Sequence, residues 1–322
     1  MEHIILYAIV PIIVVMLAGY ISGKKGIFSG DDAKKFNKVV LDYALPAALF
    51  VSIVQSTREM LAADIKLSLI ALVGIMGCFM LVYYVFKLFK SNSGADAAIS
   101  ALISGSPTIG FLGFAVLEPI FGTTPAVALV VAIVSIVVNA VGIPVGLSLM
   151  NASLEKQQPG STKKESAWLP VLHALEQPVA WAPILAVVWV LAGIPWPHWA
   201  SPSFDLIKGA NASMAVFSAG ITLSSIKVDI NWQAVLGSIM KMVLMPAVLL
   251  ILGLVFHMDP TNLKMLVVAG ALPPAFSGII IADEYNTYVA TGTSSLTLSV
   301  ILFIGFCPLW LWITDMCVGG GF

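Results

Sequence analysis

The stretch Ser104-Gly-Ser-Pro-Thr-Ile-Gly-Phe111 interrupts an apolar run, Ala97 to Phe121, that is long enough to cross a bilayer. Pro107 has no N–H, and its ring clashes with the carbonyl four residues back, so a continuous helix is strained there. In hydrocarbon, a broken helix is tolerated only where protein buries it or where it lines a wet cavity. We therefore predict two half-helices, with free N–H groups at Thr108 to Gly110 facing a cavity at the positive end of the second half.

A similar interruption recurs in the second half of the chain, at Gly270-Ala-Leu-Pro-Pro-Ala-Phe-Ser-Gly278. Broken helices in matching positions of two halves indicate the substrate site of a transporter. The alternative is that each proline only kinks a packed helix. The recurrence of the motif favours the transporter interpretation.

The composition predicts a polytopic membrane protein. Hydrophobic residues make up 59% of the 322 residues and charged residues only 10%, and the mean hydropathy is +0.99. Soluble domains carry about 25% charged residues. The net charge of −1 gives no indication of nucleic-acid binding, and the three cysteines in or beside apolar runs make a disulfide framework implausible.

Apolar runs of about 20 residues predict ten transmembrane helices in an all-α fold. These runs cover about 4–22, 36–56, 66–89, 97–121, 124–150, 178–194, 204–225, 233–257, 263–283 and 292–316. The first reads as a retained span rather than a cleaved signal peptide, because no basic segment precedes it. The longest polar link, Asn151 to Glu176, divides the helices into two sets of five. Because five is odd, the second repeat must be inverted relative to the first.

A shared spacing supports the repeat, since a serine precedes a proline by nine residues at Ser135 and Pro144 and again at Ser299 and Pro308. Orientation follows from the Lys and Arg residues of the short links, which are enriched on the cytoplasmic side. Eleven of the 16 fall in alternate links, including the central one. Both termini are therefore predicted to be extracytoplasmic and the central link cytoplasmic.

Outside the two interruptions, four polar residues within the predicted spans are candidates for function. Asn139 in the fifth span can donate to a substrate carboxylate or cap carbonyls freed near Pro107; the alternative is an ordinary interhelical hydrogen bond. Asp42 is a candidate for a coupled proton, although it lies near the cytoplasmic end, and Asp283 is the next candidate. Lys241 lies about two turns into the eighth span, where it can attract an anion, pair with a carboxylate or extend its amine to the interface.

The sequence contains no HExxH motif, no phosphate-binding Gly-rich loop and no Cys/His cluster, so we predict neither a metal site, nor a cofactor, nor an enzyme. Paired carboxylates are also absent from the fourth, fifth, ninth and tenth spans, where a cation exchanger would need them. Backbone amides, hydroxyls and one amide side chain favour an anion. The predicted substrate-binding residues are Ser104, Ser106, Pro107, Thr108, Asn139, Pro273, Pro274 and Ser277.

Three segments resemble bacterial members of the auxin efflux carrier family, and most closely its malonate and related dicarboxylate carriers. They are Tyr43-Ala-Leu-Pro-Ala-Ala-Leu-Phe50, Ser104 to Phe114 and Ala269 to Ile281. The resemblance covers essentially the whole chain. It implies an inner-membrane protein of two inverted five-helix repeats, with helices 4 and 9 crossing at Pro107, Pro273 and Pro274 at mid-membrane. One departure is that plant auxin carriers place asparagine near the crossover, where this chain has Ser106, Thr108 and Ser277.

The resemblance also implies that the chain forms a scaffold and a separate transport domain. A scaffold comprises helices 1–2 (1–64) and 6–7 (178–230), and homodimers form through it. A transport domain comprises helices 3–5 (65–150) and 8–10 (231–322) and shifts like an elevator, and residues 151–177 form the cytoplasmic loop. We therefore expect a secondary transporter of malonate or a related dicarboxylate, with or without coupled protons. The alternatives are an anion channel for small organic acids and a carrier of another monocarboxylate or auxin-like anion.

Overall fold

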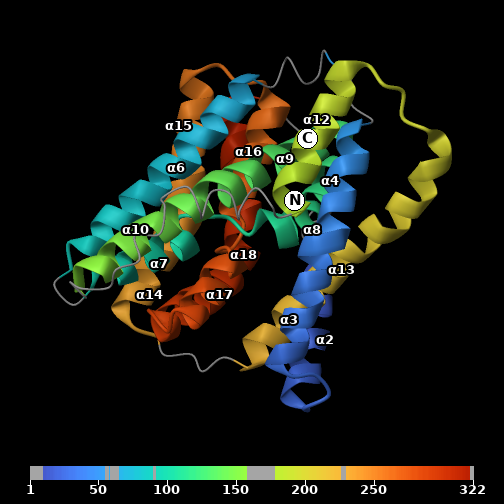
Figure 1. The fold of residues 1–322 in the computed structure, drawn as a ribbon. Coiled ribbons are helices and arrows are strands. Elements are labelled where there is room, and N and C mark those ends of the chain that lie inside the picture. The colour runs from blue at the N-terminus through green and yellow to red at the C-terminus, as the bar shows by residue number, and fades with distance from the viewer. Residues whose placement is uncertain are drawn as a thin grey trace.

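The computed structural model describes residues 10–54, 58, 65–89, 92–157, 178–225 and 230–319, and regular structure within them is helical (Figure 1). The predictions for residues 1–9, 158–177 and 320–322, which include most of the central loop, lie outside the described residues. The helices form two bundles, which are described in turn.

The first bundle contains the helices drawn at the right of Figure 1: α2 (Val10–Lys24), α3 (Gly30–Val39), α4 (Leu45–Val54), α12 (Pro178–Ala192) and α13 (Ser201–Ser225). Helix α2 packs along α13, and α4 packs on both α12 and α13. Glycines bring the α2 and α13 backbones together, because a Cβ at Gly19 would collide with the Phe217 carbonyl and a Cβ at Gly220 with the Met16 carbonyl. Small residues at such contacts are typical of helix packing in membranes.

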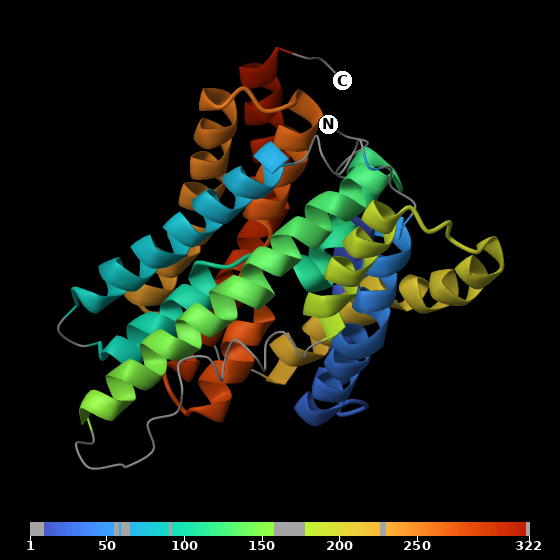
Figure 2. The same ribbon diagram turned by 45° about the horizontal axis from the view of Figure 1, so that its top comes forward.

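The second bundle contains the remaining helices: α6 (Ile65–Lys87), α7 (Gly94–Ser104), α8 (Ile109–Phe121), α9 (Pro125–Ile136), α10 (Ile143–Gln157), α14 (Trp232–Ile239), α15 (Met245–Val255), α16 (Pro260–Ala271), α17 (Phe276–Glu284) and α18 (Val289–Val318). Figure 2 shows α10 running along α7, which in turn packs on α6, with α18 behind them. Helices α8 and α9 also contact the first bundle, through α13 and α4 respectively. The division of the chain into a scaffold and a transport domain, and the movement of one against the other, stay predictions.

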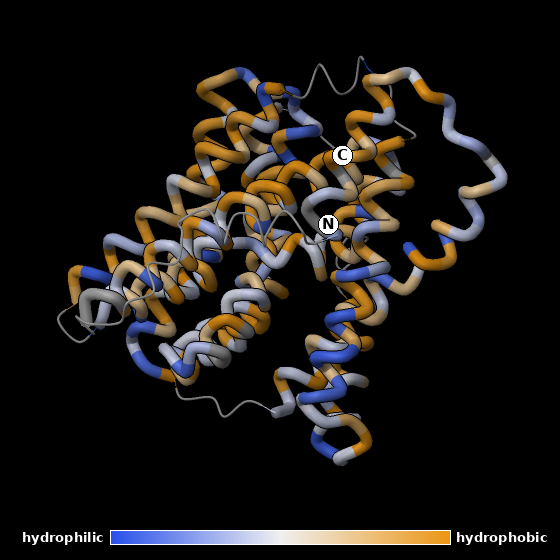
Figure 3. Tube along the Cα trace, in the orientation of Figure 1, coloured by the Kyte–Doolittle hydropathy of each residue, from blue (hydrophilic) through white to orange (hydrophobic). Residues whose placement is uncertain are grey.

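Five helical stretches in the described part of the chain are long and apolar enough to cross a membrane: Ile65–Lys87, Pro125–Leu154, Ser201–Ser225, Trp232–Val255 and Val289–Val318. Apolar residues run along the helices, and polar residues gather toward their ends (Figure 3). Large apolar side chains such as those of Leu69, Val73 and Ile301 are exposed on the outer faces. The fold is therefore that of a polytopic membrane protein, and the count of ten spans and the inverted repeat stay predictions.

The two predicted interruptions are confirmed. Helix α7 ends at Ser104 and α8 begins at Ile109, while α16 ends at Ala271 and α17 begins at Phe276. Each gap contains proline, which cannot donate to the preceding turn.

Three other helices continue through a proline by widening the turn before it into a π-helix. The segments are η2 (Val40–Ala44), η3 (Val137–Gly142) and η5 (Met240–Leu244), and Pro46, Pro144 and Pro246 each follow two residues after one of them. Because proline has no N–H and crowds the carbonyl four residues back, the extra residue in the π-turn relieves the clash. π-helical turns are frequent at functional sites, and here they contain Asp42, Asn139 and Lys241.

Candidate functional site

The two interrupted segments, 105–108 and 272–275, pair with each other, and we call them together the crossover. Pro107 and Pro274 form an isolated antiparallel bridge. The Thr108 N–H donates to the Pro273 carbonyl at 2.9 Å, and the Ala275 N–H donates to the Ser106 carbonyl at 3.0 Å. The crossover therefore fixes two segments, far apart in the sequence, in one rigid arrangement.

This pairing corrects one detail of the prediction from sequence. The Thr108 N–H is not free to face a cavity, because the Pro273 carbonyl accepts it. The N–H groups in the first turn of a helix have no partner within that helix. In α8, those of Phe111 and Leu112 donate to the Thr108 carbonyl, which leaves Ile109 and Gly110 without a backbone acceptor among the described residues.

The second half-helix has the same feature. In α17 the Gly278 N–H donates to the Ala275 carbonyl, and the N–H groups of Phe276 and Ser277 have no backbone acceptor in the described part of the chain. The positive ends of α8 and α17 thus lie on either side of one bridge. Two open N–H groups at each end form an arrangement that is suited to an anion.

Most of the crossover is buried. Ser104, Ser106 and Thr108 are each 3% exposed or less, the three crossover prolines are buried, and Ser277 is half-buried. Among the described residues, the Thr108 hydroxyl has no hydrogen-bond partner, and neither have the fully buried hydroxyls of Ser135 and Ser299. A buried polar group without a partner is costly, and such groups are uncommon enough in proteins to suggest a functional role.

The sequence prediction included Ser104 but missed Ser238 and Ser295, which form with it a cluster of three buried serines beside the crossover. The Ser238 hydroxyl donates to the Ser295 carbonyl at 3.0 Å, and the Ser104 and Ser295 hydroxyl oxygens are 3.4 Å apart. Gly237 permits this approach, because a Cβ there would lie only 2.6 Å from the Ser104 Oγ. The cluster joins α14 and α18 to the end of α7. The only sequence signal for it was the small residues at 237 and 238.

Asn139 lies in η3, and its Nδ2 donates to the Ser135 carbonyl of its own helix at 2.9 Å. An Asn amide has a second donor, and the side chain is only partly buried. The same π-turn approaches the crossover at Gly142, where a Cβ would lie 3.8 Å from the Ser106 Oγ. The predicted role of Asn139 toward substrate stays a prediction.

The three candidates for coupling lie in different places. Asp42 is half-buried in η2, within the first bundle. Lys241 is fully buried in η5, and its amine donates to the Gly270 carbonyl at the end of α16, so extension of this amine to the interface is wrong. Asp283 belongs to α17, and its side chain lies outside what the structure describes.

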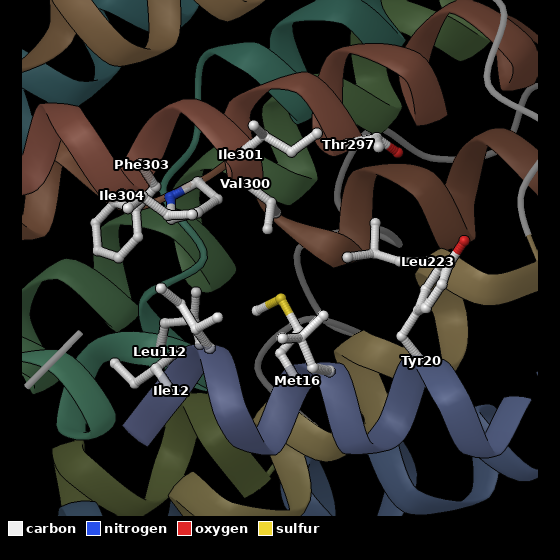
Figure 4. Close-up of a pocket in the computed structure, with 13 residues that line it drawn as sticks. Ile12, Met16, Tyr20, Leu112, Leu223, Thr297, Val300, Ile301, Phe303 and Ile304 are labelled. Carbon is white, nitrogen blue, oxygen red and sulfur yellow. The ribbon is translucent and has the colours of Figure 1, made fainter. Parts of the chain in front are cut away.

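A cavity of about 360 Å³ reaches the crossover from the boundary between the bundles (Figure 4). Ile12, Met16 and Tyr20 of α2 line one side, and residues of α18 such as Val300 line the other. Leu112 and Pro273 bring it to the crossover. The polar side chains among its lining residues are those of Tyr20 and Thr297, so the cavity wall is almost entirely apolar.

Comparison with known proteins agrees with this architecture. The family described as "Membrane transport protein" matches residues 4–311. The uncharacterized transporter YfdV of Escherichia coli K12 is 50% identical over 309 residues, which cover 96% of this chain and 97% of that protein. A putative malonate transporter of Rhizobium meliloti is 23% identical over 92% of this chain and 91% of its own length.

A probable auxin efflux carrier component of Oryza sativa is 26% identical over 155 residues, which cover 46% of this chain and 36% of that protein. The resemblance proposed from the sequence is confirmed. The chain belongs to the membrane transport protein family that includes the auxin efflux carriers.

Proposed function

We propose that this protein is a secondary carrier of small organic carboxylates, with malonate or a related dicarboxylate as the first substrate to test. The observation that carries the proposal is the pair of half-helix N-termini at the crossover, with open N–H groups at Ile109, Gly110, Phe276 and Ser277. Because backbone N–H groups and helix dipoles bind a carboxylate, recognition of its charge does not require a buried arginine.

The proposed transport movement is an elevator-like shift of the second bundle against the first. The crossover belongs to the second bundle, and the cavity that reaches it opens along α2 of the first. A shift along this boundary would carry the bound anion between the two sides of the membrane. The scaffold helices of the first bundle are also the proposed surface for homodimer formation.

A second candidate function has one observation in its favour. The apolar wall of the cavity suits a monocarboxylate with an apolar body better than it suits malonate, whose two charged groups are joined by a single carbon. An auxin-like or branched-chain monocarboxylate would place its carboxylate at the half-helix ends and its apolar body between α2 and α18.

Counterflow in proteoliposomes tests both candidates. Purified protein is loaded with unlabelled malonate, and uptake of labelled malonate is measured against a panel of mono- and dicarboxylates. Saturable counterflow inhibited best by dicarboxylates supports the first candidate, and inhibition best by apolar monocarboxylates supports the second. Non-saturable flux at channel rates would contradict a carrier, and the absence of binding or flux for every carboxylate would contradict the proposal as a whole.

A further inference from the structure

The side chain of Lys241 is the one charged group that is fully buried among the described residues. It lies in the η5 π-turn in the middle of the second bundle. A charged group at membrane depth is costly and marks a functional site by default. Its immediate partners therefore indicate what its charge does there.

The amine of Lys241 is held at the carbonyl end of a half-helix. It donates to the Gly270 carbonyl, one of the last carbonyls of α16, and it lies 3.3 Å from the Met245 Sδ. The last four carbonyls of a helix have no partner within it, and they form the negative end of its dipole. An ammonium ion at this position satisfies a carbonyl that the break at Pro273 leaves open.

Nothing in the described surroundings supplies a carboxylate to this ammonium. Cys78 of α6 is the titratable side chain that interacts with it electrostatically. Leu249 of α15 packs against Gly270, whose carbonyl accepts from the amine, and against Gly74 of α6, because a Cβ at either glycine would collide with that side chain. One turn earlier on the same helix, Ser238 joins the serine cluster at the end of α7.

Three half-helix ends therefore meet near the crossover, and the Lys241 ammonium contacts one of them. The positive ends of α8 and α17 are open for an anion, whereas the carbonyl end of α16 already has a positive partner. In carriers with broken helices, unwound carbonyls and half-helix C-termini are where a free coupling cation such as Na⁺ binds.

We propose that the Lys241 ammonium is a built-in cation, which occupies the carbonyl end of α16 in place of a bound metal cation and makes the carrier independent of Na⁺. The inference rests on the proposed function of a carrier. Whether a cation occupies the carbonyl end of α16 can nevertheless be tested without any carboxylate. Lys241 then has a positioning role, because its amine donates to the Gly270 carbonyl at the end of α16, the half-helix that leads into the crossover.

The test is cation-dependent stability of the purified protein in detergent, with no substrate present. Lys241→Ala leaves space at the Gly270 carbonyl, so methylammonium chloride should raise its Tm by about 2–4 °C over choline chloride. Lys241→Met fills the space with an apolar chain, and neither this variant nor the wild type should respond. Lys66→Ala is the matched control, because Lys66 also donates to a backbone carbonyl, that of His257, but is exposed.

A folded Lys241→Ala variant whose Tm is the same in methylammonium, sodium and choline salts would overturn the proposal. If that variant does not fold, the wild type provides the test. Replacing Na⁺ by choline should change neither its Tm in detergent nor its counterflow with choline on both sides of the proteoliposome membrane. Dependence of either on Na⁺ would overturn the built-in cation. Because the Tm measurements use no carboxylate, failure of the carboxylate site would leave them unaffected and is seen only in the counterflow of the wild type.

Discussion

Thr108 shows how one residue at the crossover has two polar groups with different environments. Its N–H donates to the Pro273 carbonyl, whereas its buried hydroxyl has no partner in the part of the chain that the structure describes. A buried hydroxyl without a partner destabilises a protein by about 1–3 kcal/mol. This cost is offset if a ligand forms a hydrogen bond with the Thr108 hydroxyl during the transport cycle.

We expect Thr108→Val to change stability and binding in opposite directions. The variant removes the unpartnered hydroxyl, so its Tm should equal or exceed that of the wild type, while carboxylate affinity falls roughly tenfold or more. Thr108→Ser, which keeps a hydroxyl, should bind substrate with nearly wild-type affinity. Thermal unfolding and equilibrium binding on the same samples provide the measurement, and wild-type binding by Thr108→Val would remove this hydroxyl from the site.

Asn139→Ala should weaken carboxylate binding by about 10- to 100-fold, because a charge-assisted hydrogen bond contributes about 1.5–3 kcal/mol. The Nδ2 donates to the Ser135 carbonyl through one of its two N–H bonds, and the second remains for substrate. Asn211→Ala in α13 is the control, since it removes another helical asparagine, one that is buried in the first bundle. Equal affinities of the two variants would show that the Asn139 amide bonds only its own helix and does not contact substrate.

Asp42→Asn tests proton coupling at the residue scale. Malonate is a dianion, and each elementary charge moved across 100 mV corresponds to about 2.3 kcal/mol, so uptake into a negative interior needs a co-transported cation or a favourable gradient. The half-buried Asp42 carboxyl is our candidate for carrying the proton. We expect the variant to show a flatter pH dependence of uptake and partly retained counterflow; an unchanged pH profile would exclude Asp42.

At the scale of the helix, the prolines that follow the π-turns and those of the crossover have different effects. Pro46, Pro144 and Pro246 are accommodated by π-turns, and their helices continue. Pro107 and Pro274 instead lie in gaps of four residues, where the chain pairs across the crossover. A helix can remain broken at the crossover because a second broken segment there supplies donors and acceptors for the freed backbone groups. No such second segment pairs with the π-turns in the described part of the chain.

Pro107→Ala should abolish transport while the protein still inserts and is expressed. Without the proline ring, α7 and α8 can join into one helix, which withdraws the open N–H groups of Ile109 and Gly110 from the site. Pro119→Ala is the control, because Pro119 lies inside the continuous helix α8. The measurements are counterflow and carboxylate binding, and binding of wild-type strength by Pro107→Ala would mean that the substrate site lies elsewhere.

At the scale of the whole molecule, a salt bridge joins the two bundles. Lys208 of α13 lies 3.3 Å from Glu118 of α8, and its ammonium also lies over the Phe114 ring. A second ion pair, between Lys264 of α16 and Asp315 of α18, lies entirely within the second bundle. An elevator-like shift must break the first pair and leave the second intact.

Cross-linking of the two pairs therefore tests the movement. In a background without the native cysteines, a short bifunctional thiol reagent that joins cysteines at positions 118 and 208 should stop counterflow, and cleavage of the link should restore it. The same link between positions 264 and 315 should leave counterflow largely intact. Normal transport by the protein linked at 118 and 208 would contradict a shift along the boundary between the bundles.

The sequence predicted features that depend on local chemistry, and it was less informative about features that depend on pairing. The breaks at Pro107 and Pro273 follow from a missing N–H, so they could be located in advance. That the two breaks meet was implied by the family resemblance alone, and the individual backbone pairs of the bridge could not be located, since no side-chain pattern specifies which backbone groups pair over more than 160 residues. The burial of Lys241 was also beyond reach, because its depth along a span does not say which helix face it occupies.

The crossover bridge has a consequence for the order in which this protein matures at the ribosome. The partners of Ser106 and Thr108 are Ala275 and Pro273, so the first half of the chain emerges with these backbone groups unpaired. At about 5–20 residues per second, the delay until the second half is synthesised is on the order of 10–30 s. During that interval the nascent chain holds an open helix break in the bilayer. We therefore expect the nascent first half to bind an insertase or chaperone that shields these polar backbone groups until translation ends.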